Sequence, residues 1–318
     1  MYESQKEYSF APHLLEQNDN FEELWTMSEI RLGGGDQRPT VVGGGGKVIL
    51  QGLKKGTYLN SAIVGLDSIT GKIIWQIPAT GSGPGEKIIQ NNVLYRGTSG
   101  TAAIQSYNIE NGELIWQTWL PGGHSVVEIY FAENKLFAYT SDSEFFVLNE
   151  EGMILDNFQN DLRVFLEMNG VLYVERNFAI TALDSSTKNE IWQSEIEDYY
   201  THSPIFDNGT IILRTWVTPA YIYSIDQYTG RVNWKVLKDV LSNLYVSNGK
   251  IYFLSSDGFL VVLDKKSGNE ILRLEFSPAF DLKGQYSGYF VSGDSDNDVL
   301  VVSFGDNTQI IGLRISDP

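Results

Sequence analysis

The side chains best suited to chemistry are few in this chain, and their spacing does not form a catalytic or metal-binding motif. Its 318 residues include three histidines, His13, His124 and His202, and no cysteine. None of the histidines has another two or four positions away, the local spacing that metal sites use. Without cysteine the chain has no disulfide, thiolate ligand or thiol nucleophile. We therefore predict neither a histidine metal site nor cysteine-based catalysis.

An acidic stretch comes nearest to a metal motif. Asp294, Asp296 and Asp298 in GDSDNDV resemble the start of a calcium-binding loop. Such a loop needs Gly at its sixth position and Glu at its twelfth, whereas this chain has Val299 and Gly305 there. We interpret the stretch as a solvated acidic hairpin and keep a calcium site as the weaker alternative.

The glycine-rich segments do not fit a nucleotide site. GLDSITGK, from Gly65 to Lys72, has six steps between its glycines where a phosphate-binding loop has five. Ile73 also stands where such a loop needs Ser or Thr. We predict no cofactor from these residues.

A short phrase recurs along the chain and indicates the elements that hold everything else. It reads LDSITGKIIWQ, YNIENGELIWQ, LDSSTKNEIWQ and IDQYTGRVNWK at positions 66–76, 107–117, 183–193 and 225–235. Alignment on its acidic or amide residue gives steps of 41, 41, 35, 42 and 38 between Asp67, Asn108, Asn149, Asp184, Asp226 and Asp264. A period near 40 in a strand-rich chain is typical of propeller blades.

Each period contains four short strand patterns separated by turn residues. Asn169-Gly170 and Asn248-Gly249 supply the positive φ angles of two-residue hairpins. Gly71 takes the left-handed position between the third and fourth strands, and Lys188 replaces Gly there in the fourth unit. One period therefore predicts one four-stranded antiparallel blade.

The two ends of the sequence supply the halves of one further blade. IIGLRISDP at positions 310–318 matches the third-strand half of the phrase, and FEELWTMSEI at positions 21–30 matches its fourth-strand half. We expect the N-terminal strand to complete the last blade and remove an open edge. The fold class is therefore all-β: residues 21–318 form one seven-bladed β-propeller, and residues 1–20 form an N-terminal arm.

The fourth-strand Trp residues follow a packing rule across the units. Trp25, Trp75, Trp116, Trp192 and Trp234 align with Gly, Ser or Ala on the third strand. The two units without Trp have Val147 and Val262 there instead. An indole needs the space that a small residue leaves, so we expect these Trp residues to be buried between blades.

At these residues the chain resembles the PQQ-like (pyrroloquinoline-quinone-like) repeat family of β-propellers. The family's blade phrase joins a small residue, Asp, a Thr-Gly turn and a fourth-strand Trp. The residues that we take as the structural repeat are Trp25, Asp67, Gly71, Trp75, Trp116, Asp184, Trp192, Asp226, Gly230, Trp234, Asp264 and Gly268. Quinoprotein dehydrogenases of this family are larger and bind PQQ and calcium. The resemblance therefore implies the non-enzymatic branch, with a quinone-dependent oxidoreductase as the least favoured alternative.

The net charge of −17 restricts the partners. It disfavours nucleic acid and anionic membrane surfaces, both of which require a basic face. No segment has 18 consecutive apolar residues, so we expect no direct membrane insertion and a soluble monomer. A cytoplasmic protein and a trimmed extracytoplasmic protein both fit, and we favour the second.

Strand order predicts which face of the ring binds a partner. Links between blades and links between second and third strands share one face, and this face gathers aromatic and basic residues. We predict a docking site for a protein or peptide there, on a non-enzymatic scaffold, with a lectin-like carbohydrate site as the alternative. The predicted contacts are Trp119, His124, Tyr199, Tyr200, His202, Arg214, Trp216 and Tyr286.

Overall fold

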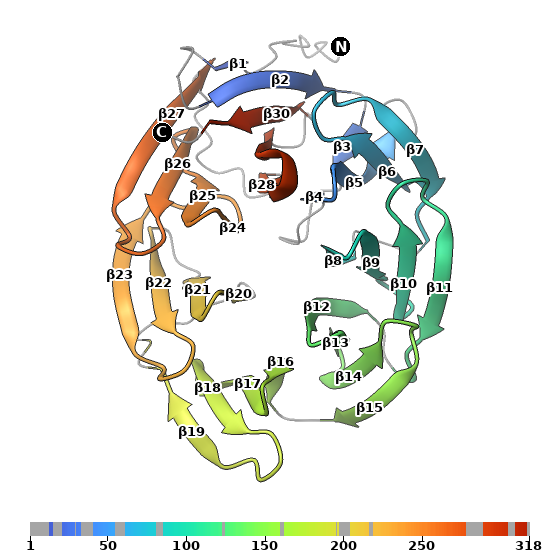
Figure 1. The fold of residues 1–318 in the computed structure, drawn as a ribbon, viewed down its shortest axis with the longest axis vertical. Coiled ribbons are helices and arrows are strands. Elements are labelled where there is room, and N and C mark those ends of the chain that lie inside the picture. Colours follow the sequence, from blue (N-terminus) through green and yellow to red (C-terminus); the bar gives the residue numbers. More distant parts are fainter. Residues whose placement is uncertain are drawn as a thin grey trace, which may run out of the picture.

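Seven antiparallel sheets form a closed ring around a central axis (Figure 1). The structure, a computed structural model, describes residues 13–14, 21–28, 30–32, 41–54, 61–80, 85–122, 125–159, 162–194, 196, 204–215, 219–277, 289–304 and 309–316. Within these ranges it contains strands β1 to β30 and one three-residue 3-10 helix, η1. The predicted all-β propeller of seven four-stranded blades is confirmed.

Blades 1 to 4 follow one another along the chain, each running from its inner to its outer strand. Blade 1 has β3 (Ile30–Leu32), β4 (Val41–Gly44), β5 (Lys47–Lys54), β6 (Ser61–Asp67) and β7 (Ile73–Pro78). Blade 2 has β8 (Lys87–Gln90), β9 (Val93–Gly97), β10 (Ala103–Asn108) and β11 (Leu114–Trp119). Blade 3 has β12 (Val126–Ala132), β13 (Lys135–Thr140), β14 (Glu144–Asn149) and β15 (Ile154–Gln159). Blade 4 has β16 (Arg163–Met168), β17 (Val171–Arg176), β18 (Ala179–Asp184) and β19 (Glu190–Gln193).

Blades 5 to 7 complete the ring. Blade 5 has β20 (Ile205–Asp207), β21 (Thr210–Arg214), β22 (Ala220–Asp226) and β23 (Val232–Lys238). Blade 6 has β24 (Tyr245–Ser247), β25 (Lys250–Leu254), β26 (Phe259–Asp264) and β27 (Glu270–Ser277). Blade 7 has β28 (Phe290–Asp294), η1 (Ser295–Asn297), β29 (Val299–Phe304), β30 (Gln309–Ile315) and, as its outer strand, β2 (Phe21–Met27).

Burial along the strands explains why the sheets stack into a ring. The middle strands are buried on both faces, as in β6, where five consecutive residues from Ala62 to Leu66 are buried. The outer strand β23 instead alternates between exposed and half-buried residues. A sheet that is apolar on both faces must be covered on both, and the neighbouring blades supply that cover.

The predicted hairpin turns have the expected backbone. Asn169 and Gly170 have φ angles of 53° and 73°, and Asn248 and Gly249 have 47° and 72°. Lys188 adopts φ 59° in the turn where other blades have Gly. These positive angles are those of the two-residue turns that match strand twist.

The ring closes by pairing the two ends of the chain. Phe21 lies opposite Ile315 and Met27 opposite Ile310 in the antiparallel β2–β30 ladder, so the split last blade is confirmed. The closing strand ends at Met27, earlier than the expected residue 30. Ile30 already pairs with Lys54 in blade 1, because the chain has crossed to the next sheet.

Part of the N-terminal arm is itself a strand. In β1 (His13–Leu14), His13 lies opposite Ser277 and Leu14 opposite Phe276 on the outer edge of β27 (Figure 1). Blade 6 therefore has a fifth strand that the repeat pattern did not predict. The repeat gave no indication of it because β1 lies outside the periodic sequence.

Candidate protein-docking face

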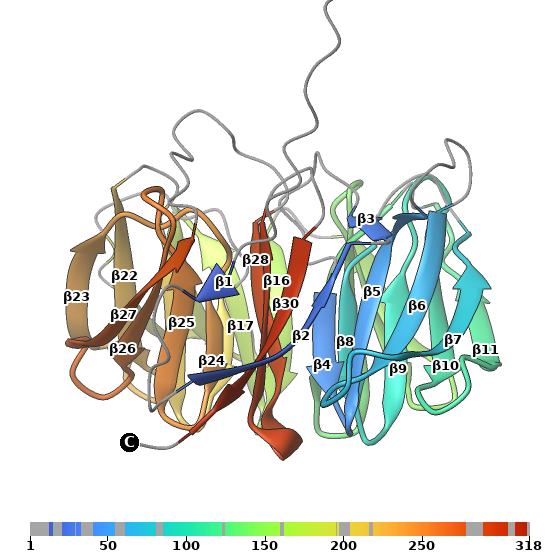
Figure 2. The ribbon, with the colours of Figure 1, turned by 90° about the horizontal axis from the view of Figure 1, so that it is seen from above.

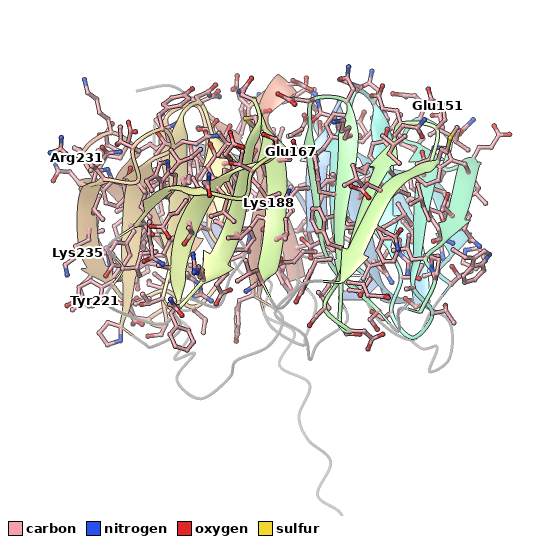
Figure 3. The ribbon with its side chains drawn as sticks, turned by 90° about the horizontal axis from the view of Figure 1, so that it is seen from below. Glu151, Glu167, Lys188, Tyr221, Arg231 and Lys235 are labelled. Atoms are coloured by element: carbon pink, nitrogen blue, oxygen red, sulfur yellow. The ribbon has the colours of Figure 1, made fainter. Side chains whose placement is uncertain are left out.

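The strand order gives the ring two faces of different construction. The loop face carries the links between blades and between second and third strands, and the hairpin face carries the turns between first and second and between third and fourth strands (Figure 2). Figure 3 shows Glu151 and Arg231 at the hairpin face and Tyr221 at the loop-face end of its blade.

On the hairpin face, turns of neighbouring blades are bonded to each other. Gly45 N of blade 1 donates to Asp296 Oδ2 of blade 7 at 2.9 Å. Asn169 N of blade 4 donates to Glu133 Oε1 of blade 3 at 2.7 Å. Lys265 of blade 6 forms an ion pair with Asp207 of blade 5. Many polar groups of this face are thus already used to hold the ring together.

The three aspartates of the calcium-loop resemblance belong to this bonding. Asp294 is fully buried at the N-terminus of η1, where its carboxylate accepts from Asp296 N at 3.3 Å and Asn297 Nδ2 at 2.8 Å. Asp298 Oδ1 accepts from Asn248 Nδ2 at 3.2 Å. The interpretation as a solvated hairpin is therefore wrong for Asp294. In the described part of the chain, no three His, Cys, Asp or Glu side chains are grouped to hold a metal ion.

On the loop face, the structure describes two of the predicted partner contacts. Trp119 ends the outer strand of blade 2, and its side chain is 61% exposed. Its exposed ring is accessible to a partner, and its role as a contact stays a prediction. The second is Arg214. The remaining six lie outside the described residues and stay predictions: His124, Tyr199, Tyr200, His202, Trp216 and Tyr286.

Arg214 corrects the expectation of an exposed basic contact. It ends β21 with only 8% of its surface exposed, and its Nη1 donates to the Val240 carbonyl at 3.0 Å. Burial lowers the pKa of Arg214 to about 10. Topology placed the residue at the correct end of the blade but could not show that the inter-blade link covers it.

The loop face has a further exposed aromatic residue that the sequence analysis missed. Phe178 lies in the link between β17 and β18 of blade 4, and it is 59% exposed. Its φ is 62°, and that of Asn177 is 51°. The hairpin turns were predicted from Asn followed by Gly, and this turn has Asn followed by Phe. The Asn between two apolar strands was the available indication.

The repeat aspartates are structural residues of the third-to-fourth-strand turns. Asp67 Oδ1 accepts from Thr70 Oγ1 at 2.7 Å and from Thr70 N at 2.8 Å. The bond from the Thr70 hydroxyl is the main cause that lowers the pKa of Asp67. Asp184, Asp226 and Asp264 make the same bonds to the Thr or Ser three residues on. Each carboxylate therefore closes its turn.

The Trp residues lie where the packing rule placed them. Trp75 pairs with Gly65 across the strands, and a Cβ atom at Gly65 would lie 2.2 Å from Trp75 Cε2. Trp25 pairs with Gly312, and the two units without Trp pair Val147 with Asp156 and Val262 with Leu272. Trp25 and Trp75 are buried, whereas the indoles of the other three are only half-buried because the outer strands border solvent: Trp116, Trp192 and Trp234.

Each of these indoles also contacts the next blade, which defines an indole clamp. A Cβ atom at Gly112 would lie 2.6 Å from Trp75 Cε3, and Trp75 Nε1 donates to the Ile109 carbonyl at 2.8 Å. The same contact pairs Trp25 with Gly71, Trp116 with Gly152, Trp192 with Gly230 and Trp234 with Gly268. The repeat glycines are therefore needed for close packing as well as for their positive φ.

Blade 2 carries a buried basic pair next to blade 1. Lys87 and Arg96 lie opposite each other on β8 and β9 and are 1% and 0% exposed. Arg96 donates to the Gln51 and Gln105 side chains at 3.1 and 2.7 Å. Lys87 Nζ donates to the Gly85 carbonyl at 2.7 Å. Burial, followed by the charge of Arg96, lowers the pKa of Lys87 to about 7.

Fold and repeat together define a β-propeller of PQQ-like blades. A family model with the description "outer membrane protein assembly factor BamB" matches residues 59–161 and 150–304, and the chain belongs to this PQQ-like repeat family. No curated protein matches the sequence. In the described residues, no helix has the length and apolar character required to span a bilayer.

Solved structures share the fold at low sequence identity. BamB from Moraxella catarrhalis is 14% identical with a TM-score of 0.55, over 94% of this chain and 98% of that one. A chain of the mitotic checkpoint complex is 10% identical with a TM-score of 0.69, over 97% of both. The WD40 β-propeller domain of Doa1 is 15% identical with a TM-score of 0.59, over 94% of this chain and 99% of that one. At these identities the likeness shows the fold alone.

Proposed function

We propose that this propeller is a scaffold that docks a protein partner on its loop face. The observation that carries the proposal is the contrast between the faces. Turns of the hairpin face bond to each other, as Gly45 does to Asp296. The exposed ring of that face, Tyr228, packs against Gly209 in the neighbouring turn of its own blade. The loop face instead exposes the rings of Trp119 and Phe178. Exposed aromatic residues are the side chains that most often anchor protein interfaces.

The relatives agree with a scaffold role. The family model takes its description from an outer-membrane assembly factor, and one structural neighbour is a chain of the mitotic checkpoint complex. These descriptions concern those proteins, and they reach this chain by analogy of family and fold. A protein partner rather than a small ligand also fits the spacing of the exposed rings. Trp119 lies on blade 2 and Phe178 on blade 4, so an occupant of both must cross blade 3.

Site-specific photo-crosslinking tests the choice of face. A photo-reactive amino acid replaces Trp119 in one variant and Glu151, which lies on the hairpin face (Figure 3), in a matched control. Both are expressed in the native host, and crosslinked products are identified by mass spectrometry. We expect a discrete protein adduct from position 119 and none from position 151. The reverse pattern would reject the loop face, and binding on a glycan array that Trp119→Ala removes would favour the carbohydrate alternative.

A further inference from the structure

Phe178 occupies a backbone position at which the other two-residue turns of the same geometry use Gly or Asn. The Asn177-Phe178 turn has φ angles of 51° and 62°. The first-to-second-strand turns of blades 1 to 6 have the same pair of positive angles, and their second residues are Gly46, Asn92, Asn134, Gly170, Gly209 and Gly249. Those six turns lie on the hairpin face. The aromatic exception lies on the loop face.

This position is unfavourable for a bulky side chain. In the left-handed region the Cβ atom approaches the following carbonyl, and Gly alone avoids the conflict, while Asn and Asp tolerate it. Phe178 therefore destabilises the turn relative to Gly. Such strain persists where the surrounding structure imposes it, and it concentrates at functional sites.

Burial of the ring does not account for the choice of Phe. With 59% of its surface exposed, Phe178 recovers only part of the free energy that burying an aromatic side chain gives. The middle strands that flank the turn are buried, and Val174 and Ile180 are both fully buried. The blade thus has a buried core below an aromatic residue that is mostly exposed at its loop-face end.

The surroundings indicate the charge of an occupant. Arg176, next to the turn, forms an ion pair at 3.3 Å with Glu190 of β19, so it leaves no excess charge beside the turn. The chain as a whole carries −17 and attracts cationic segments. Within the molecule, cations already lie over aromatic rings: Arg273 is 4.6 Å from the centroid of Phe259, and Lys235 is 5.0 Å from that of Tyr221. An exposed Phe ring offers the same contact to an Arg or Lys from outside.

We propose that Phe178 is a specificity-determining anchor of the loop face and that it binds a segment of a protein partner in which Arg or Lys stands beside aliphatic residues. The aliphatic side chains pack on one part of the ring, and the cation lies over its face. The inference rests on the proposed scaffold function, because it places the anchor on the same face. It explains why the strained Phe is kept where Gly would give a more stable turn.

The test uses a phage-displayed library of random 16-residue peptides, selected on the intact protein. We expect basic-aliphatic peptides to be enriched. For an enriched peptide, Phe178→Gly should raise Kd by at least about 10-fold while raising the melting temperature, because strain is relieved as the anchor is lost. Phe178→Ala should raise Kd equally without the gain in melting temperature, because Ala removes the ring and keeps the strain.

Asn134→Gly is the matched control. It changes the same turn position on the hairpin face, and Asn134 is exposed and has φ 59°. This variant should raise the melting temperature slightly and leave Kd unchanged.

The outcomes separate the two proposals. If peptides lose affinity with Trp119→Ala but keep it with Phe178→Gly, the loop face stands and the anchor is rejected. If no basic-aliphatic peptide is enriched, the anchor proposal fails and the crosslinking at positions 119 and 151 still decides the face. If the enriched peptides crosslink at position 151 and keep their affinity for both variants, both proposals fail. An unchanged or lower melting temperature of Phe178→Gly would contradict the strain argument by itself.

Discussion

The seven junctions between blades are of two kinds. Five have an indole clamp, in which a Trp on one blade packs on the turn glycine of the next. The junctions between blades 3 and 4 and between blades 6 and 7 have none. At the first, Asp156 replaces the Trp and Lys188 replaces the glycine. At the second, Leu272 replaces the Trp, and blade 7 has no such turn because its fourth strand is β2.

The clamp and its receiving glycine are therefore lost together, which indicates that they function as one unit. A non-glycine residue is present at the turn only where no indole comes from the preceding blade. Lys188 keeps the left-handed backbone at φ 59°, so the turn itself does not require glycine absolutely. What requires glycine is the absence of a Cβ atom below the indole.

The junction of blades 3 and 4 uses an ionic link at the inner strands instead. Arg163 on β16 bonds to Glu128 on β12, with Nε to Oε2 at 3.1 Å, and to Glu175 at 3.1 Å. The Glu128 side chain is 4% exposed. Burial alone would lower the pKa of Arg163, but Glu128 and then Glu175 raise it on balance. Burial raises the pKa of Glu175.

The junction of blades 6 and 7 uses an amide. Asn243 Nδ2 donates to the Val291 carbonyl at 2.8 Å, and its Oδ1 accepts from Val291 N at 3.0 Å. The side chain thus satisfies both backbone groups of one residue on the inner strand of blade 7. The ring is therefore held at the rim by indoles in five places and near the axis by polar links in the other two.

Removing a clamp should give the largest loss of stability. We expect Trp75→Ala to lower the free energy of unfolding by about 3–5 kcal/mol, because it leaves a cavity between blades 1 and 2. Gly65→Val should also destabilise, since its Cβ atom would lie 2.2 Å from the indole. Denaturant unfolding measures both. An unchanged midpoint for Gly65→Val would show that the small residue is not needed for the clamp.

Breaking the ionic link should have the next largest effect. Arg163→Ala leaves Glu128 buried without its counter-charge, and we expect a loss of about 3 kcal/mol. The double variant Arg163→Met with Glu128→Leu should recover most of it, because apolar side chains of similar size remove the uncompensated charge. If the double variant is as unstable as the single one, this junction depends on the ion pair in itself.

Loss of the amide link should cost less. Asn243→Ala removes both hydrogen bonds to Val291 and should lower the free energy of unfolding by about 2 kcal/mol. Asn243→Asp is the matched variant, because its carboxylate accepts from Val291 N but cannot donate to the Val291 carbonyl. Its free energy of unfolding should therefore lie between those of the unchanged protein and Asn243→Ala. Hydrogen exchange of the Val291 amide measures the local effect. Unchanged protection in Asn243→Ala would reject the link.

The buried Lys87 makes the stability of the protein depend on pH at the junction of blades 1 and 2. Its pKa is about 7 in the folded protein and 10.5 in the unfolded chain, so the unfolded chain binds more protons between these values. The free energy of unfolding therefore rises with pH between about 7 and 10.5. Below this range Lys87 is charged in the folded protein, and the full cost of burying that charge is present. Lys87→Met should stabilise by about 1 kcal/mol at pH 6, and the gain should vanish near pH 10.5. A gain independent of pH would contradict the ionisation argument.

Much of the fold was predictable because the residues that pack together in a blade are a fixed, short distance apart in the sequence. The pairing of Trp75 with Gly65 and of Val147 with Asp156 follows from a fixed offset between strands, and so does closure by residues 21–27. The compensating links were not predictable. Arg163 and Glu128 lie on separate blades, and no repeat relates them. Asn243 lies in an inter-blade segment that has no period.

The candidate site was harder to predict for the same reason. Strand order placed Trp119 and Arg214 on the loop-face ends of their blades, but exposure depends on what covers each end, and Arg214 is covered. Phe178 was missed because its turn lacks the glycine that marks such turns. The dihedral angles, rather than the residue types, identified it.

Closure of the ring by β2 also determines the order of events during biosynthesis. Glu22 pairs with Arg314, a separation of 292 residues, so the closing ladder cannot form until β30 has left the ribosome. Until then β2 has no partner in its blade, and β30 then exposes an open ladder until the two meet. Pairings this distant in sequence form slowly, and open strand edges recruit other chains. The nascent protein is therefore most prone to aggregation in the interval between the emergence of β30 and its pairing with β2.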